Sequence, residues 1–209
     1  MARTALVRDF IRYEGLSRLP RTVLKALTPL DFHIFALQRG DSPRAAPLPA
    51  GVAVYENALE RLQARRGEQA ASASEFWRDK INGASRCAII ECGEELAGVG
   101  WVYEYPAQRP LLLLAPGTAE MSGFYVLARF RGRGFYRMLL HGMVEGQMRR
   151  QRQLFMVAAG DNPRSISAIA AAGFREAAII RRRPIGGGPK FAVAAAPIAQ
   201  PAESNAAIA

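Results

Sequence analysis

The sequence has few side chains that bind metals or form disulfides. It contains two cysteines and two histidines in 209 residues, and their spacing assembles no set of metal ligands. Cys87 and Cys92 fall an odd number of positions apart in one predicted strand, so their side chains should point to opposite faces and not bridge. Two isolated thiols are typical of a reducing compartment, which predicts a cytoplasmic protein without a metal.

A long hydrophobic run is also missing. Arg8, Asp9 and Arg12 interrupt the first apolar stretch, which argues against a signal peptide, and no stretch approaches the length of a transmembrane helix. Residues 1–30 instead predict a basic helical extension with apolar stripes, divided at Pro20. Such a segment either packs on the neighbouring domain, which we favour, or lies on an anionic membrane surface.

Acidic residues are the minority among the charged ones. Lys and Arg total 28 against 18 Asp and Glu, a formal charge of +10. The excess favours anionic partners such as nucleotide phosphates, anionic lipid or an acidic substrate, although the arginine- and alanine-rich composition fits a GC-rich genome equally well. No nucleic-acid-binding motif or platform of basic and aromatic residues is found, so nucleic acid is not an expected partner.

The chain predicts one α/β domain over residues 31–196 and a disordered Ala/Pro-rich tail over 197–209. Apolar periodicity and turn residues define the elements of the domain. The expected strands are Phe32–Leu37, Val52–Tyr55, Cys87–Glu91, Leu96–Tyr105, Ala119–Val126, Gln153–Ala158 and a closing pair, Glu176–Arg182 with Lys190–Ala195. The expected helices are Ala58–Arg66, Ser74–Ile81 with Ser74 as N-cap, Phe135–Arg149 and Ser165–Ala172, and Pro106–Pro116 is an expected loop.

The most informative stretch is the strand, glycine-spaced turn and helix between Gly123 and Gly142. Glycines at 132 and 134 let the backbone approach an oxyanion, and the unpaired amides of the first helical turn point toward it. Arg131 and Arg133 add positive charge. The stretch lacks the Gly-Lys-Ser/Thr of a P-loop and the third glycine of a dinucleotide fold. It predicts an anion cradle, and the alternative is a tight connection without a ligand.

Two motifs in this chain resemble the GNAT superfamily of N-acetyltransferases. Arg129, Gly132 and Gly134 match the family's turn that grips the pyrophosphate of coenzyme A. Asn162, followed by Gly173 and Phe174, matches the short helix after the family's fifth strand. The resemblance covers Phe32 to Pro197. It implies a GNAT-like α/β fold with a mixed, mostly antiparallel sheet flanked by helices.

The resemblance also implies acetyl-CoA, or another acyl-CoA, as co-substrate and an amine as acceptor. In this family the fourth strand splays from the fifth, and the pantetheine arm fills the gap. By position, the pantetheine and carbonyl contacts are then the backbone of Tyr125, Val126 and Ala128, with a polar contact from Asn162. The pyrophosphate contacts come from the turn, namely Arg129, Arg131, Gly132, Arg133, Gly134 and Phe135.

The catalytic groups follow less directly. An amine must lose its proton before it attacks, which calls for a general base. Glu120 lies where some family members carry a catalytic glutamate; its alternative role is an ion pair with one of the many arginines. The family's usual acid, a tyrosine, is replaced by Ile169, which leaves Tyr125, Tyr136, water or unassisted thiolate departure as alternatives.

The acceptor is the least defined part. The resemblance implies a pocket built from the first two helices and the closing strands, around Arg65, Trp77, Arg78 and Arg181–Pro189. Their basic character favours an acidic or carboxylate-bearing acceptor. We therefore expect an acyl-CoA-dependent N-acetyltransferase that forms a tetrahedral intermediate. The alternative is a GNAT-fold module that binds acyl-CoA or a partner without turnover.

Overall fold

The computed structural model describes residues 29–41, 47–69, 73–107, 109, 111–151, 153–182 and 191–192. Residues 1–28 of the expected basic extension and the expected tail at 197–209 lie outside the described residues. The central sheet has seven strands in the order β2-β3-β4-β6-β7-β1-β8. These strands are β1 (Leu30–Gln38), β2 (Val52–Tyr55), β3 (Arg86–Cys92), β4 (Glu95–Glu104), β6 (Thr118–Val126), β7 (Gln153–Ala159) and β8 (Arg175–Arg182).

Within this sheet β6 and β7 are parallel, and every other neighbouring pair is antiparallel. The expectation of a mixed, mostly antiparallel sheet is confirmed. The helical elements are α3 (Leu59–Gln69), the 3-10 turn η2 (Ser74–Trp77), α4 (Arg78–Asn82), the 3-10 turn η3 (Ala128–Phe130), α5 (Phe135–Met148) and α6 (Pro163–Ala171). Ser74 is not the N-cap expected of it, because it lies inside η2 and Ala73 precedes the turn.

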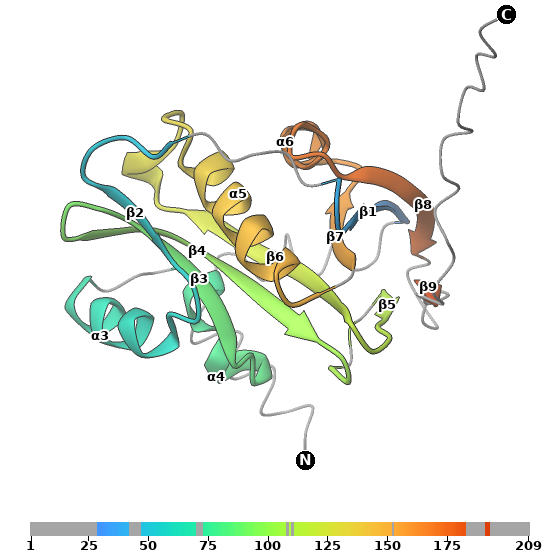
Figure 1. Ribbon diagram of the computed structural model, residues 1–209, viewed down its shortest axis with the longest axis horizontal. Coiled ribbons are helices and arrows are strands. Elements are labelled where there is room, and N and C mark those ends of the chain that lie inside the picture. The colour runs from blue at the N-terminus through green and yellow to red at the C-terminus, as the bar shows by residue number, and fades with distance from the viewer. Residues whose placement is uncertain are drawn as a thin grey trace, which may run out of the picture.

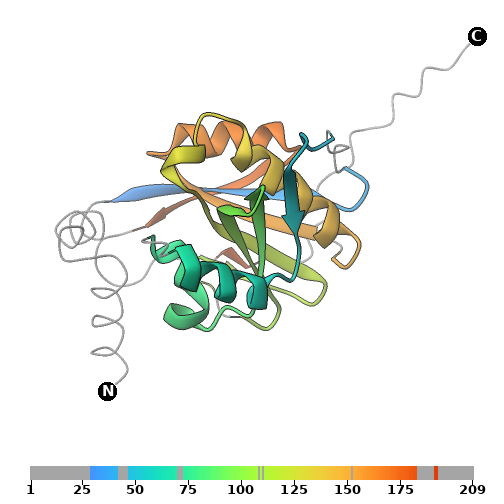
Figure 2. The same ribbon diagram turned by 90° about the vertical axis from the view of Figure 1, so that its left-hand side faces the viewer.

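Helices cover both faces of the sheet (Figures 1 and 2). One face packs against α5 and α6 in a first core cluster that contains Met121, Leu139 and Ile169. The opposite face packs against α3 and η2 in a second cluster that contains Leu62, Phe76 and Trp101. Burial on both faces explains why β3 and β4 are continuous apolar runs rather than alternating ones.

The two cysteines lie on opposite faces, as the spacing predicts. Cys87 is buried in the second cluster, and Cys92 packs against the first. Both thiols are free, and burial raises the pKa of Cys87 to about 12. A thiol that keeps its proton at neutral pH is a poor nucleophile, so Cys87 serves the core.

The position of β1 is the main feature that the sequence pattern did not predict. β1 lies between β7 and β8 and is antiparallel to both, although more than a hundred residues separate it from either strand. Its central residues, Ile34 to Leu37, are all buried. This N-terminal strand therefore connects β7 to β8, the two C-terminal strands of the sheet, which do not pair with each other.

The expected closing hairpin is wrong. β8 pairs with β1, and β9 (Phe191–Ala192) forms a separate parallel pair with β5 (Leu112–Leu113). β5 itself lies in the segment Pro106–Pro116, which was expected to be a loop. The physical reason is that Leu112 is buried in the second cluster, which holds β5 where Phe191 and Ala192 pair with it. β8 pairs with β1 through one edge, and its other edge has no strand beside it among the described residues.

Candidate functional site

The site begins where β6 leaves β7. The two strands pair only from Thr118 to Glu120 against Gln153 to Phe155. Beyond Glu120, β6 stays on β4 as far as Val126 while β7 diverges, so one edge of β6 has no strand beside it among the described residues (Figure 1). Backbone groups along such an edge are available to a ligand that runs parallel to the strand.

A bulge in β6 sets which side chains face which side. The register against β4 shifts between Val99 and Trp101, where Tyr125 and Ser122 are the partners on β6. Gly123 lies in this bulge with a φ of +63°, and a Cβ there would stand 3.1 Å from Trp101 Cδ1. Backbone conformation and space therefore both favour glycine at this position.

The turn after β6 forms a concave array of amides. Gly132 and Gly134 have φ values of +75° and +81°, which gives the backbone alternating handedness. Gly134 is the N-cap of α5, and the first helical bond runs from the Met138 amide to the Gly134 carbonyl. The amides of residues 135–137 therefore have no partner within the helix. A Cβ on Gly132 would meet no atom within 4 Å, so the space above the turn is open to a ligand.

A cavity of about 290 Å³ joins the edge of β6 to this turn. It is lined by Phe124, Tyr125, Val126, Phe130, Arg131, Gly132, Gly134, Phe135, Tyr136 and Ser165. Six residues predicted from the sequence as coenzyme A contacts are in this set, and Ala128, Arg129, Arg133 and Asn162 are not.

The three arginines of the turn have different surroundings. Arg131 donates from Nε to the Val126 carbonyl over 3.0 Å, and its guanidinium lies 5.0 Å from the centre of the Tyr125 ring. Arg129 forms an ion pair of 2.9 Å with Glu95. The Arg133 guanidinium lies over the Phe135 ring at 5.4 Å. Arg131 is thus the turn arginine that contacts the cavity.

Asn162 caps α6. Its side-chain oxygen accepts a hydrogen bond from the Ser165 amide over 3.2 Å. At the other end Gly173 has a φ of +86°, and the Phe174 amide bonds the Ile169 carbonyl, as in a Schellman cap. Ile169 and Phe174 are both buried in the first cluster. Ile169 therefore faces the core, and its helix presents no acid at that position.

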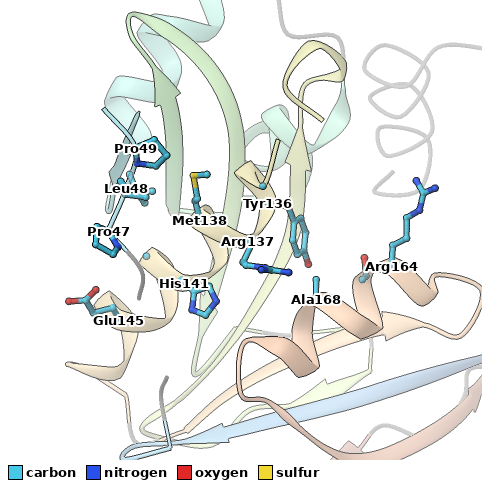
Figure 3. A pocket seen from close by; sticks show the side chains of 14 residues that line it. Pro47, Leu48, Pro49, Tyr136, Arg137, Met138, His141, Glu145, Arg164 and Ala168 are labelled. Atoms are coloured by element: carbon cyan, nitrogen blue, oxygen red, sulfur yellow. The ribbon is translucent and has the colours of Figure 1, made fainter. Parts of the chain in front are cut away.

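A larger cavity of about 1000 Å³ continues from the first one, because Gly134, Tyr136 and Ser165 line both. It is bounded by α5, α6 and the segment Pro47 to Pro49, and Figure 3 shows the Tyr136 side chain directed toward α6. Arg137, His141 and Arg164 contribute polar groups. Burial raises the pKa of Tyr136 to about 12, so the phenol stays protonated at neutral pH. The sequence reasoning missed this cavity because its walls come from three distant segments.

Glu120 lies on β6 at the last residue paired with β7. Both of its carboxylate oxygens accept hydrogen bonds from Arg109, over 2.8 and 2.9 Å. Arg109 also donates to Ser122 Oγ and lies 3.7 Å from the centre of the Tyr103 ring. Regular alternation would place Glu120 on the side of Val126, but the bulge at Gly123 puts it on the side of the second cluster. The ion pair with an arginine that was expected as the alternative role of Glu120 is therefore present, although the sequence did not single out Arg109 as the partner.

No group of three or more His, Cys, Asp or Glu side chains within the described residues is arranged to hold a metal ion. None of the helices in the described part of the chain has the length and apolar character needed to cross a bilayer.

A sequence model of the acetyltransferase (GNAT) family matches residues 52–174, which is more than half of the chain. The chain belongs to the GNAT acetyltransferase family. The matched region runs from β2 past the end of α6, and it contains the β6 edge, the turn and all residues that line the smaller cavity. No curated protein matches the chain.

Solved structures show the same GNAT fold. A GNAT-family acetyltransferase from Novosphingobium aromaticivorans is 20% identical with a TM-score of 0.50, over 74% of this chain and 63% of that one. A GCN5-related N-acetyltransferase from Sphaerobacter thermophilus is 17% identical with a TM-score of 0.51, over 85% and 59%. One from Kribbella flavida is 14% identical with a TM-score of 0.50, over 81% and 65%. The chain spans about three fifths of the length of these structures.

Proposed function

We propose that the chain transfers an acyl group, most simply acetyl, from acyl-CoA to a primary amine. The observation that carries this proposal is the continuity of the free edge of β6 with the concave amides of the turn, through one cavity. A long ligand that fits this arrangement has an anionic group for the amides of the turn and an arm with amide groups for the edge of β6. Coenzyme A has this chemistry, and the GNAT family match supports it.

In this proposal the pyrophosphate lies on the amides of residues 132–135, where the backbone is concave and the first turn of α5 adds partial positive charge. The Arg131 amide already donates to the Ala128 carbonyl, so Arg131 takes part through its side chain. The pantetheine arm runs along Tyr125 and Val126 in the gap beside β6. The adenosine end extends into the larger cavity between α5 and α6, where Arg137 and Arg164 supply cations. Asn162, as the cap of α6, borders the arm.

Acyl transfer from a thioester to an amine has three chemical requirements. The amine must be held in its neutral form, the thioester carbonyl needs donors as it gains negative charge, and the thiolate must leave. Backbone amides of the free β6 edge are the proposed donors. Glu120 is the proposed general base, acting through water, because its strand borders the gap and Arg109 already occupies both of its oxygens. Tyr125 lines the cavity on the same strand and is the proposed acid.

The test is release of free coenzyme A from acetyl-CoA across a panel of primary amines, with acetylated amine detected by mass. Amine-dependent thiol release that produces the acetylated amine would support transfer. A second function, acyl-CoA binding without turnover, is favoured by the burial of Ile169 at the position of the family's usual acid. Calorimetric binding of acetyl-CoA without thiol release for any amine would favour that alternative and contradict the proposed enzyme.

A further inference from the structure

We infer that the acceptor amine carries a carboxylate and that Arg78 binds it. This inference rests on the proposed function, because it concerns the acceptor side of the same site. It starts from the bulge in β6. Arg78 is the first residue of α4, and its Nε lies 3.8 Å from the point where a Cβ on Gly123 would stand. The guanidinium therefore lies beside the bulge that separates the free edge of β6 from its paired part.

Arg78 has no charged partner among the residues that the structure describes. Its neighbour Asp79 is turned toward the other side, where Arg66 Nη1 binds it over 2.8 Å. Both of those side chains are almost fully buried. Arg66 also lies 4.1 Å from the centre of the Trp77 ring and donates to the Phe76 carbonyl. This cluster holds the start of α4 in place, and it leaves Arg78 on the face toward β4 and β6.

Asn82, at the other end of α4, also faces β4. Asn82, one helical turn after Arg78, bonds the Tyr103 hydroxyl over 3.1 Å. Tyr103 pairs with Glu120 across the two strands, and Trp101 pairs with Ser122. Side chains from α4, from β6 and from the segment before β5 thus form one polar strip, defined by Arg78, Ser122, Arg109 and Glu120. The strip runs from the bulge toward a cavity of about 580 Å³ whose lining includes Asn82, Tyr103 and Arg109.

The charges of this strip do not balance. Arg109 and Glu120 neutralise each other through two hydrogen bonds. The Arg78 guanidinium remains without a counter-ion among the described residues. Because it is half-buried, a bound anion that supplies the missing negative charge stabilises it. A single guanidinium fits a singly charged carboxylate, which it binds with two parallel hydrogen bonds. A phosphate dianion would call for a second free cation, and the strip offers none. The acceptor that fits is an amine bearing a carboxylate, as in an amino acid.

The test uses conjugates in which coenzyme A is joined by a thioether-linked acetyl group to the amine of glycine, β-alanine or 4-aminobutyrate. Each conjugate is paired with its carboxamide, which has the same shape without the charge. For at least one spacer, the full-length protein should bind the carboxylate about ten- to a hundredfold more tightly than the carboxamide in calorimetry. Arg78→Gln should bring that ratio close to one, and Arg78→Lys should retain part of it.

Arg149→Gln is the matched control, because Arg149 is an exposed arginine on the far end of α5. It should keep the full preference. Equal binding of carboxylate and carboxamide at every spacer would overturn the inference, and so would a preference that survives Arg78→Gln. Acetyl-CoA binding separates the two proposals. If acetyl-CoA binds and discrimination is absent, only the inference fails; if neither acetyl-CoA nor any conjugate binds, the proposed function fails with it.

Discussion

The Nε atom of Arg131 donates a hydrogen bond to the backbone carbonyl of Val126 over 3.0 Å. This contact links the turn proposed for pyrophosphate to the strand edge proposed for pantetheine. The carbonyl is a group that a pantetheine amide would use, and the guanidinium is a group that a pyrophosphate would attract. One side chain is therefore shared between the two halves of the proposed acyl-CoA site.

Arg131→Gln should weaken acetyl-CoA binding and spare a ligand without pyrophosphate. A hydrogen bond to a charged group contributes about 1.5–3 kcal/mol, so the loss should be about tenfold or more in Kd. S-acetylpantetheine has no pyrophosphate, and its affinity should stay the same or improve as the Val126 carbonyl is released. Calorimetry with acetyl-CoA and with S-acetylpantetheine measures the change in Kd for each ligand. An equal loss for the two ligands would show that Arg131 acts on the arm or on the fold instead.

A second prediction concerns the backbone of the turn. Gly132 has a φ of +75°, yet a Cβ there meets no atom within 4 Å. Gly132→Ala should therefore cost about 1–2 kcal/mol of stability through backbone strain alone. Gly132→Glu should carry the same strain and also place a negative charge over the proposed pyrophosphate site, which should abolish detectable acetyl-CoA binding. Unchanged acetyl-CoA affinity in a folded Gly132→Glu protein would remove the turn from the proposed site.

The turn was predictable because its signals are local. Glycine spacing, the strand before it and the helical period after it all lie within one short stretch, and Gly132 and Gly134 have the positive φ values that the spacing suggests. The Schellman cap at Gly173 is local in the same sense. Each of these features depends on backbone preferences that a few neighbouring residues determine.

The remaining features depend on contacts between distant segments. Nothing in Leu30–Gln38 says that this strand will lie between β7 and β8, and nothing in the expected closing pair says that Phe191 and Ala192 will pair with β5. The bulge at Gly123 changed the face of Glu120, since one inserted residue reverses the alternation of a strand. An ion pair of Glu120 with an arginine was one of the two expected roles, but Arg109 lies in a segment without regular periodicity, so nothing singled out this arginine as the partner.

A third prediction is a loss of stability in acid that depends on His141. Burial, and then the charge of Arg137, lower the pKa of His141 from its ordinary value of 6.5. Its Nδ1 is buried without a hydrogen-bond partner among the described residues. The unfolded chain therefore takes up the proton at higher pH than the folded one. The resulting stability is fully present above pH 6.5 and is lost as the pH falls through the folded pKa.

Urea unfolding at about pH 7.5 and about pH 5.5 tests this sign. The free energy of unfolding should fall between the two values in the wild type, and the fall should be smaller in His141→Gln. His33→Gln is the control, because His33 already has a carboxylate partner in Glu176. An identical fall in the wild type and in His141→Gln would contradict the assignment to His141.

The last prediction separates a catalytic Glu120 from a structural one. The carboxylate accepts two hydrogen bonds from Arg109, and both side chains are nearly buried. Glu120→Gln keeps the shape of the side chain but removes the base and the charge. An ion-pair role predicts a loss of folding stability, and a catalytic role predicts a loss of kcat as well. Glu91 is the matched control: it is a buried carboxylate on β3 that accepts two hydrogen bonds from Arg61, away from the gap. Glu120→Gln and Glu91→Gln should lower the free energy of unfolding by similar amounts, a few kcal/mol at most.

If Glu120 is the base, Glu120→Gln alone should lower kcat with a competent amine, about a hundred- to ten-thousandfold at neutral pH, with acetyl-CoA affinity unchanged. Part of that loss should return as the pH approaches the pKa of the amine, because the free amine then needs no base. A Glu120→Gln protein with the kcat of Glu91→Gln would assign Glu120 to the Arg109 ion pair alone.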